Sequence, residues 1–139
     1  MKYLLDTNVI SEMQKTNCNP GLISFMGAIH PQDVFLSVLS IGEICYGVEK
    51  LPPGKKKHEL SLWLYNELPR WFNGRIIPFE TEVMIEWGRL RADSPRTIPI
   101  ADSLIASAAI THHMALVTGN IKDFKDIPGI NLINPWELE

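Results

Sequence analysis

The chain has 139 residues, of which 45% are apolar and 21% charged, and a chain of this length can bury a core without disulfides, so we expect a single domain over residues 1–139. No apolar run approaches the ~20 residues of a membrane-spanning helix and the first residues lack the features of a secretory signal, which excludes a membrane protein and favours a cytoplasmic one. The net charge of −3 and isoelectric point of about 5.8 exclude a general attraction to nucleic acids, so any contact with RNA or DNA must be local.

Short β-like runs alternate along the chain with longer helical segments, and turn residues separate them. This alternation is typical of a mainly parallel sheet that helices cover on both faces, because parallel strands need a crossover connection. We therefore predict an α/β fold without internal repeats. Its strands are predicted at residues 3–5, 34–36, 75–77, 116–117 and 131–133.

Apolar residues recur at helical spacing in three longer segments. Helices are predicted at residues 59–71, 81–91 and 100–112. The tryptophans of these helices (Trp63, Trp71 and Trp87) are expected in the core rather than as a surface for stacking bases. Leu62 and Tyr65 lie outside the apolar stripe of the first helix, so a contact with a partner is an alternative to ordinary core packing.

The cysteines and the lysine run carry no specific signal of a site. Cys18 and Cys45 lack the CxxC spacing and the neighbouring His of a zinc site, and we expect reduced thiols. Lys55, Lys56 and Lys57 form the one dense cationic run, which is interpreted as the solvated start of a helix.

Acidic side chains follow several predicted strands, at the edge of the sheet where the carboxyl ends of parallel strands meet. Asp6 ends the first strand, Glu43 is expected in the first turn of the helix after the second, and Asp102 in the first turn of the helix at 100–112, while Asn120 and Asp123 follow the fourth strand. Like charges at one edge disfavour joint ionisation, so this cluster predicts a bound cation. Oxygen ligands without His or Cys select Mg²⁺ or Mn²⁺ over zinc, and such a site suits phosphoester chemistry.

Most of these residues also have a purely structural explanation when considered alone. Glu43 stands three residues after Ser40, which is a capping-box spacing, and the helix dipole favours Asp102 in a first turn. Asp123 lies in a polar loop, where a solvated acid needs no partner. Asp6 is the hardest to explain in this way, because its neighbours in sequence offer no obvious partner at the end of a central strand. The prediction of a site therefore depends on the convergence of these positions.

Two threonines and an asparagine accompany the acidic residues. Thr7 and Thr118 both follow strands at the same edge, where each either supports a metal-bound water or a phosphate, or caps a helix. Asn8 is a candidate N-cap for the helix that contains the segment VISEM. His112 and His113 lie near a helix C-terminus, where His is electrostatically favourable without any catalytic role.

Four segments occur in the order and spacing of a known family. LLDTNVISE, LSVLSIGEICYGVEKL, IPIADSLIASAAITHHMALVTGNIKDF and NLINPWEL resemble the PIN-domain ribonucleases, in particular the VapC and FitB toxins of toxin–antitoxin systems, over nearly the whole chain. The resemblance implies a PIN-like α/β/α sandwich, a homodimer and Mg²⁺- or Mn²⁺-dependent cleavage of RNA, with tRNA among the candidate substrates. It also implies a cognate antitoxin that silences the toxin, often with an Arg against the acidic cluster, and operator DNA that is bound only through the antitoxin.

Carried over residue by residue, the resemblance matches Asp6, Glu43 and Asp102 to the three acidic metal-site positions of the family. The implied mechanism is in-line attack by a metal-activated water that leaves a 5′-phosphate and a 3′-hydroxyl. Asp6 and Asp102 would hold the metal, and Glu43 would orient or deprotonate the water.

The fourth acidic position departs from the family pattern. The family commonly has Thr-Arg-Asn or Thr-Arg-Asp followed by Asp-Phe, whereas this chain has Thr118, Gly119 and Asn120, followed by Asp123. Gly119 in place of Arg removes a phosphate contact or a structural contact. Asn120 and Asp123 are both candidates for the fourth position, and only Asp123 supplies charge.

Two other functions are compatible with the acidic cluster. A Mg²⁺-dependent phosphatase for a small molecule uses an Asp after the first strand as nucleophile, but such enzymes usually carry a DxD motif, which DTN here does not match. A regulatory binding module would keep the acidic residues to receive an antitoxin Arg and would act in operator binding with little nuclease activity. A small overlapping upstream reading frame would favour the toxin interpretation.

Overall fold

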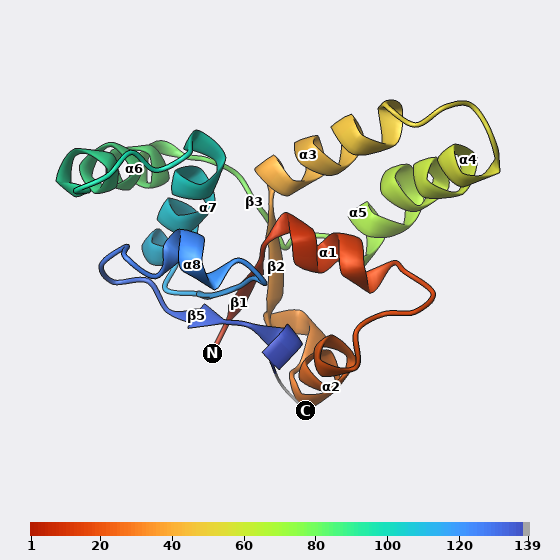
Figure 1. Cartoon of the computed structure of the whole chain (residues 1–139), viewed down its shortest axis with the longest axis horizontal. Helices are drawn as coiled ribbons and strands as arrows, with labels where there is room; N and C mark the ends of the chain where they lie inside the picture. The colour runs from red at the N-terminus through yellow and green to blue at the C-terminus, as the bar shows by residue number, and fades with distance from the viewer. Residues whose placement is uncertain (138–139) are drawn as a thin grey trace.

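A computed structural model describes residues 1–137 and contains a five-stranded sheet with helices on both faces (Figure 1). The strand order is β3-β2-β1-β4-β5, and every neighbouring pair is parallel. Leu4 lies opposite Phe35 on one side and Leu116 on the other. The predicted strands and the α/β/α arrangement are confirmed. The strands are β1 (Tyr3–Leu5), β2 (Val34–Ser37), β3 (Ile76–Ile77), β4 (Ala115–Val117) and β5 (Leu132–Ile133).

The order of the strands reverses between β1 and β4. The chain adds β2 and β3 on one side of β1, and later adds β4 and β5 on the other side. In open parallel sheets, such a reversal leaves a crevice beyond the carboxyl ends of the two central strands, and ligands bind there. Asp6 directly follows β1 and Thr118 directly follows β4, so both residues lie at this reversal.

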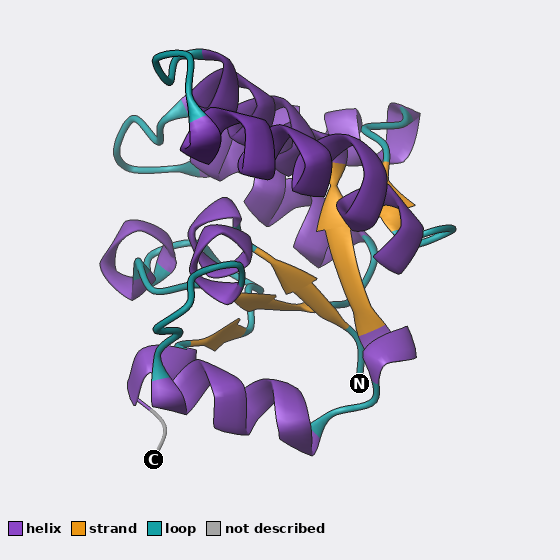
Figure 2. Ribbon diagram, turned by 90° about the vertical axis from the view of Figure 1, so that its right-hand side faces the viewer, coloured by secondary structure: helices purple, strands orange, loops and turns teal. Residues whose placement is uncertain are grey.

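The helices form two groups, one on each face of the sheet (Figures 1 and 2). The group on one face consists of α1 (Thr7–Met13), α2 (Pro20–Ala28), α3 (Val38–Glu49), α4 (Lys55–Leu62) and α5 (Leu68–Trp71). The other group consists of α6 (Thr81–Asp93), α7 (Ile100–Thr111) and α8 (Ile121–Phe124). Within residues 1–137, no helix has both the length and the apolar character that a membrane crossing requires.

Successive strand residues point to opposite faces, and this divides the hydrophobic core into two parts. Leu4 and Leu116 pack with buried residues of α6, α7 and α8. Leu5 and Val117 pack with buried residues of α1, α2, α3 and α5. The sheet is therefore covered on both sides, which explains why its strands read as short, fully apolar runs.

The helix predicted at residues 59–71 begins earlier and contains a wider turn. α4 starts at Lys55, which confirms the interpretation of the lysine run as a helix start. A short 3₁₀ helix, η1 (Pro31–Asp33), precedes β2, and a π-helical turn, η2 (Trp63–Glu67), joins α4 to α5. Pro69 has no N–H to continue the α-helical pattern, and the Leu68 N–H bonds to the Trp63 carbonyl, five residues back.

Trp71 is an exception to the predicted aromatic core. From the π-helical turn onward, the buried positions recur every four residues, at Leu64, Leu68 and Phe72. Trp71 falls outside this spacing and is 55% exposed, so its prediction as a core residue is wrong. The other two tryptophans of the stripe are half-buried.

α2 has no counterpart among the predicted helices. Its start nevertheless carries two local signals. The Asn19 side chain caps the helix by accepting hydrogen bonds of 2.9 and 3.3 Å from the N–H groups of Gly21 and Leu22, and Pro20 occupies the first helical position. The helix buries Leu22 against the sheet.

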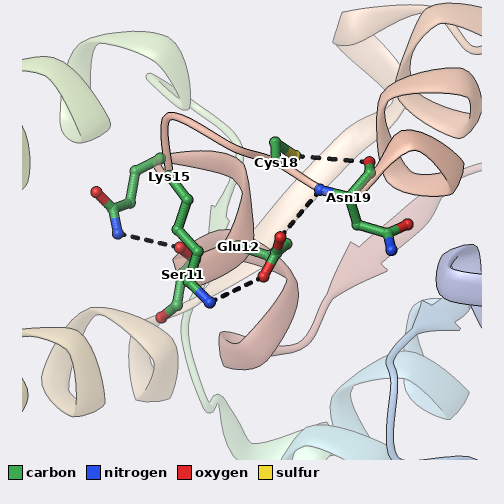
Figure 3. A network of polar contacts seen from close by, with 6 residues as sticks. Ser11, Glu12, Lys15, Cys18 and Asn19 are labelled. Atoms are coloured by element: carbon green, nitrogen blue, oxygen red, sulfur yellow. Dashed lines mark hydrogen bonds and ion pairs between the residues drawn. The ribbon is translucent and has the colours of Figure 1, made fainter.

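A polar network joins the end of α1 to the start of α2 (Figure 3). The Glu12 carboxylate accepts a 2.9 Å hydrogen bond from the Asn19 N–H and pairs with Lys15 at 3.1 Å. The hydrogen bond from Lys15 is the main reason why the pKa of Glu12 is lowered. The Cys18 thiol donates to the Asn19 carbonyl at 3.8 Å. These contacts fix the C-terminal end of α1. The N-terminal end of the same helix, at Thr7, directly follows Asp6.

Candidate active site

Asp6 ends β1 and caps the helix that follows. One carboxylate oxygen accepts a 2.8 Å hydrogen bond from the Thr7 N–H, and the other accepts a 2.8 Å bond from the Thr118 hydroxyl. The N-cap of α1 is therefore Asp6, and the prediction of Asn8 at this position is wrong. Asp6 also has partners that its local sequence does not reveal, because Thr118 lies 112 positions away.

Glu43 lies in the second turn of α3, and the prediction of a first-turn position is wrong. α3 begins at Val38, and Ser37 caps it by accepting a 3.4 Å hydrogen bond from the Ser40 N–H. The capping-box alternative for Glu43 therefore does not hold. Instead, Glu43 Oε1 accepts a 2.6 Å hydrogen bond from the Thr7 hydroxyl, and the Ser40 hydroxyl lies 2.9 Å from the same Thr7 oxygen.

Asp102 is the third residue of α7, in the first turn as predicted. The neighbouring Ser103 is fully buried and fixed by two hydrogen bonds. The Trp87 indole N–H donates to its hydroxyl at 2.9 Å, and this hydroxyl donates to the Ile100 carbonyl at 2.8 Å. These contacts hold the start of α7, and with it Asp102, against α6.

The acidic residues act on one another electrostatically. Burial is the main cause that raises the pKa of Asp6, and the charges of Glu43 and Asp123 raise it further, whereas its two hydrogen bonds lower it. Burial also raises the pKa of Asp102, followed by the charges of Asp123, Asp6 and Glu43. The structure therefore brings these four predicted residues to one edge of the sheet, which we call the acidic rim.

The donor groups of the acidic rim are of the kind that binds a hard divalent cation. They are carboxylate and hydroxyl oxygens, which favour Mg²⁺ or Mn²⁺. In the part of the chain that the structure describes, no three His, Cys, Asp or Glu side chains are grouped closely enough to hold an ion. Mg²⁺ keeps several of its waters and takes only one or two carboxylates, so an open rim is compatible with it.

The two candidates for the fourth acidic position differ in their surroundings. Asn120 is exposed, and its backbone N–H donates a 3.0 Å hydrogen bond to the Thr118 hydroxyl oxygen. Asp123 is half-buried in α8, and its charge raises the pKa of both Asp6 and Asp102. Asn120 therefore supports Thr118 through its backbone, and Asp123 adds charge to the acidic rim.

Arg96 is a cation at the acidic rim that has no counterpart among the predicted site residues. Its guanidinium donates a 2.8 Å hydrogen bond to the Asp123 carbonyl and lies 3.5 Å from the Asp126 carboxylate. Its charge lowers the pKa of Asp102, against the larger raising effect of burial. The only sequence signal is one basic residue in the loop before α7, which does not distinguish a site from a surface.

Gly119 is adjacent to a closely packed tryptophan. Trp136 lies in η3 (Pro135–Glu137), and a Cβ atom at position 119 would lie 3.0 Å from Cε3 and Cζ3 of its indole ring. The Gly119 N–H also donates to the Asn8 side chain at 3.5 Å. A larger side chain here would displace Trp136, which gives a packing reason for Gly in place of the Arg that the resemblance leads one to expect.

Comparisons with known proteins place the chain in a family. The PIN domain model matches residues 3–130. VapC ribonuclease Y4jK of Sinorhizobium fredii is 30% identical over 137 residues, which cover 96% of this chain and 97% of that protein. Toxin FitB of Neisseria gonorrhoeae is 32% identical over 136 residues, with coverage of 96% and 97%.

A solved structure gives the same result for the fold. FitAB bound to an IR36 DNA fragment contains a chain that superposes with a TM-score of 0.90 and 33% identity, over 99% of this chain and 97% of that one. The match extends over the sheet, both helical layers and the segments that carry the acidic rim. The chain therefore belongs to the PIN-domain family.

Proposed function

We propose that the protein is a Mg²⁺- or Mn²⁺-dependent endoribonuclease that acts in the cytoplasm as the toxin of a toxin–antitoxin pair. The observation that carries this proposal is the acidic rim, where Asp6, Glu43, Asp102 and Asp123 lie at the reversal of strand order and their charges raise the pKa of Asp6 and of Asp102. Two relatives, VapC ribonuclease Y4jK and toxin FitB, support RNA as the substrate and toxicity as the role.

In the proposed reaction, Asp6 and Asp102 hold the cation. When bound, Mg²⁺ or Mn²⁺ supplies a Lewis acid beside the scissile phosphate. The Thr7 N–H and the Thr118 hydroxyl orient the Asp6 carboxylate, which places its oxygens before any ion arrives. Asp123 adds the charge that balances a divalent ion.

Glu43 handles the proton of the attacking water in this proposal. Its Oε1 is held by the Thr7 hydroxyl, and Oε2 is left to orient and deprotonate the water. Because Glu43 is exposed, substrate can reach it without a change in the fold. In-line attack would leave a 5′-phosphate and a 3′-hydroxyl.

We further propose that the toxin is a homodimer that binds a cognate antitoxin and reaches operator DNA only through it. The complex of FitAB with DNA supports this arrangement. Leu62 and Tyr65 are 48% and 57% exposed and are candidates for the dimer or antitoxin surface. Unchanged oligomeric state and antitoxin binding in Leu62→Ser/Tyr65→Ser would remove them from that surface.

The test of the proposed activity is cleavage of a panel of labelled tRNA and mRNA by purified protein that is free of antitoxin. We expect cuts at defined positions with Mg²⁺ or Mn²⁺ and none with EDTA. Absence of cutting by folded protein at saturating metal would contradict the nuclease and favour the alternative of a regulatory binding module.

A further inference from the structure

Two hollows open at Glu43, and they differ in their side chains. One, of about 580 Å³, lies between α3 and Phe79, has Val38 and Tyr46 among its lining residues, and is bordered by no Lys or Arg. The other, of about 240 Å³, lies between α1, α3 and α4 and extends from Thr7 and Glu43 to Lys56 and Trp63. We call this second hollow the α1–α4 groove.

The α1–α4 groove continues outward. Lys56 and Trp63 also line an outer hollow of about 460 Å³. The outer hollow contains charges of both signs, from Lys15, Glu59 and Glu67. In the inner hollow, the charged lining residues are Glu43, at the site itself, and Lys56.

Three consecutive lysines begin α4, and their surroundings differ. Lys55 pairs with Glu59 at 3.9 Å, and Lys57 donates a 3.0 Å hydrogen bond to the Glu49 carbonyl. Among residues 1–137, Lys56 has no ion pair or hydrogen-bond partner, and it borders both the inner and the outer hollow. Its ammonium group is available to an anion in the groove.

We propose that the α1–α4 groove is the path by which single-stranded RNA runs from the acidic rim, with Lys56 contacting one backbone phosphate and Trp63 offering an indole face to a base. The inference rests on the proposed ribonuclease function and adds the direction of the strand. A phosphodiester at Glu43 has two hollows open to its neighbouring nucleotides, and of these the α1–α4 groove supplies a free ammonium group and an indole ring. Phosphates bind lysine, and bases stack on aromatic rings in sequence-tolerant contacts.

The negative net charge of the chain increases the effect that this single lysine is expected to have on RNA binding. At a net charge of −3, the molecule as a whole repels RNA, and the acidic rim repels it further until a cation is bound. One uncommitted lysine beside the rim therefore changes the binding of a strand more than one lysine on a basic protein would. The expected footprint is one phosphate, because the acids of the outer hollow follow directly.

The test compares Lys56→Ala with Lys55→Ala, which removes the same charge from the same turn of α4. Binding of a labelled single-stranded oligonucleotide that the wild type cleaves is measured with Mg²⁺ at several salt concentrations, for proteins that all carry Glu43→Gln, so that the strand stays intact while the acidic rim keeps its cation. We expect Lys56→Ala to weaken binding about fivefold at low salt and to reduce the slope of log K against log salt by about 0.7, the value for one phosphate on a single strand. Lys55→Ala should match the wild type in both quantities, and Lys56→Arg should restore them.

Steady-state cleavage with Mg²⁺ provides a second readout. We expect Lys56→Ala to raise KM with kcat unchanged, because the contact holds the strand outside the reacting bond. Cleavage and binding that are insensitive to Lys56, or an equal loss in Lys55→Ala, would overturn the path. A Lys56→Ala protein with weakened antitoxin binding and unchanged RNA binding would assign the groove to a peptide and also overturn it. A wild type that neither cuts nor binds RNA would overturn the proposed function together with the path.

Discussion

The Thr118 hydroxyl donates a 2.8 Å hydrogen bond to the Asp6 carboxylate, although 112 positions separate the two residues. They follow β4 and β1, which are neighbours in the sheet, so the bond crosses the point where the strand order reverses. Thr118 is fully buried, and its oxygen also accepts a 3.0 Å hydrogen bond from the Asn120 N–H. One hydroxyl therefore links the end of β1 to the start of α8.

Thr118→Val removes this hydroxyl with little change in side-chain size. We expect a loss of about 2 kcal/mol in the free energy of unfolding, since a hydrogen bond to a charged group is lost and the Asn120 N–H is left without its partner. The pKa of Asp6 should also rise, because this bond lowers it. Thr118→Ser keeps the hydroxyl and serves as the control in urea unfolding. Equal losses in both variants would contradict the role of the hydroxyl.

Asp6→Asn is expected to make the metal-free protein more stable at neutral pH. A raised carboxyl pKa means that the folded state binds the proton more tightly than the unfolded state. The protonated Asp6 carboxyl therefore stabilises the fold fully below its pKa in the unfolded state, near 3.8. This stabilisation is lost as the pH rises through the pKa of Asp6 in the folded state. Asn keeps the cap through Oδ1, can donate from Nδ2 to the Thr118 oxygen in place of accepting from that hydroxyl, and removes the charge. Its Tm should therefore exceed that of the wild type by a few degrees at about pH 7 and lose this advantage at about pH 3.

Calorimetry across this pH range, in EDTA, measures the difference. Added Mg²⁺ should raise the Tm of the wild type and leave that of Asp6→Asn nearly unchanged, because a ligand stabilises only the state that binds it. A lower Tm for Asp6→Asn than for the wild type at neutral pH would show that the Asp6 charge is favourable in the fold, against this account.

Arg96→Ala removes a cation that lowers the pKa of Asp102 and a hydrogen bond to the Asp123 carbonyl. We expect the acidic limb of the pH–rate profile to move to higher pH and kcat/KM to fall about tenfold, as is typical when catalytic groups lose their positioning. Arg89→Ala is the control, because Arg89 is an exposed residue of α6. An unmoved acidic limb in Arg96→Ala would contradict the electrostatic role of Arg96.

Gly119→Ala would place a methyl group 3.0 Å from the Trp136 ring, and we expect a cost of about 1–3 kcal/mol from overpacking. Gly88→Ala is the control in α6, where a Cβ meets nothing within 4 Å, and it should stabilise the protein by about 0.5–1 kcal/mol. Trp136→Leu should relieve the cost in a double-mutant cycle. Additive effects of the two changes would mean that Trp136 does not determine the residue at position 119.

The strands and the positions of Asp6 and Asp102 were predictable because each is encoded locally. A run such as YLL followed by Asp6 marks both a buried strand and a polar residue at its end, and the parallel order of the strands then brings such ends together. Asp102 was placed correctly because its position in the first turn of α7 follows from the apolar pattern of the helix itself.

Features that depend on distant residues were not predictable in this way. The second oxygen of the Asp6 carboxylate accepts from Thr118, 112 positions away, and the contact of Glu43 with Thr7 joins residues 36 positions apart. Arg96 reaches α8 from another loop, so its nearness to Asp102 is a property of the fold. Trp71 is exposed because the π-helical turn changes the spacing of the buried positions, whereas the prediction was based on a regular α-helical repeat.

The most direct test of the metal site is a Mn²⁺ titration of the wild type and of Asp6→Asn. Bound metal is measured by electron paramagnetic resonance, and cleaved RNA is measured in the same samples. In the wild type, cleavage should rise in proportion to bound Mn²⁺, and Asp6→Asn should lose both bound Mn²⁺ and cleavage while it remains folded. Cleavage by folded Asp6→Asn at the wild-type rate, or wild-type cleavage that persists without bound metal, would contradict the assignment of the acidic rim as a metal-dependent nuclease site.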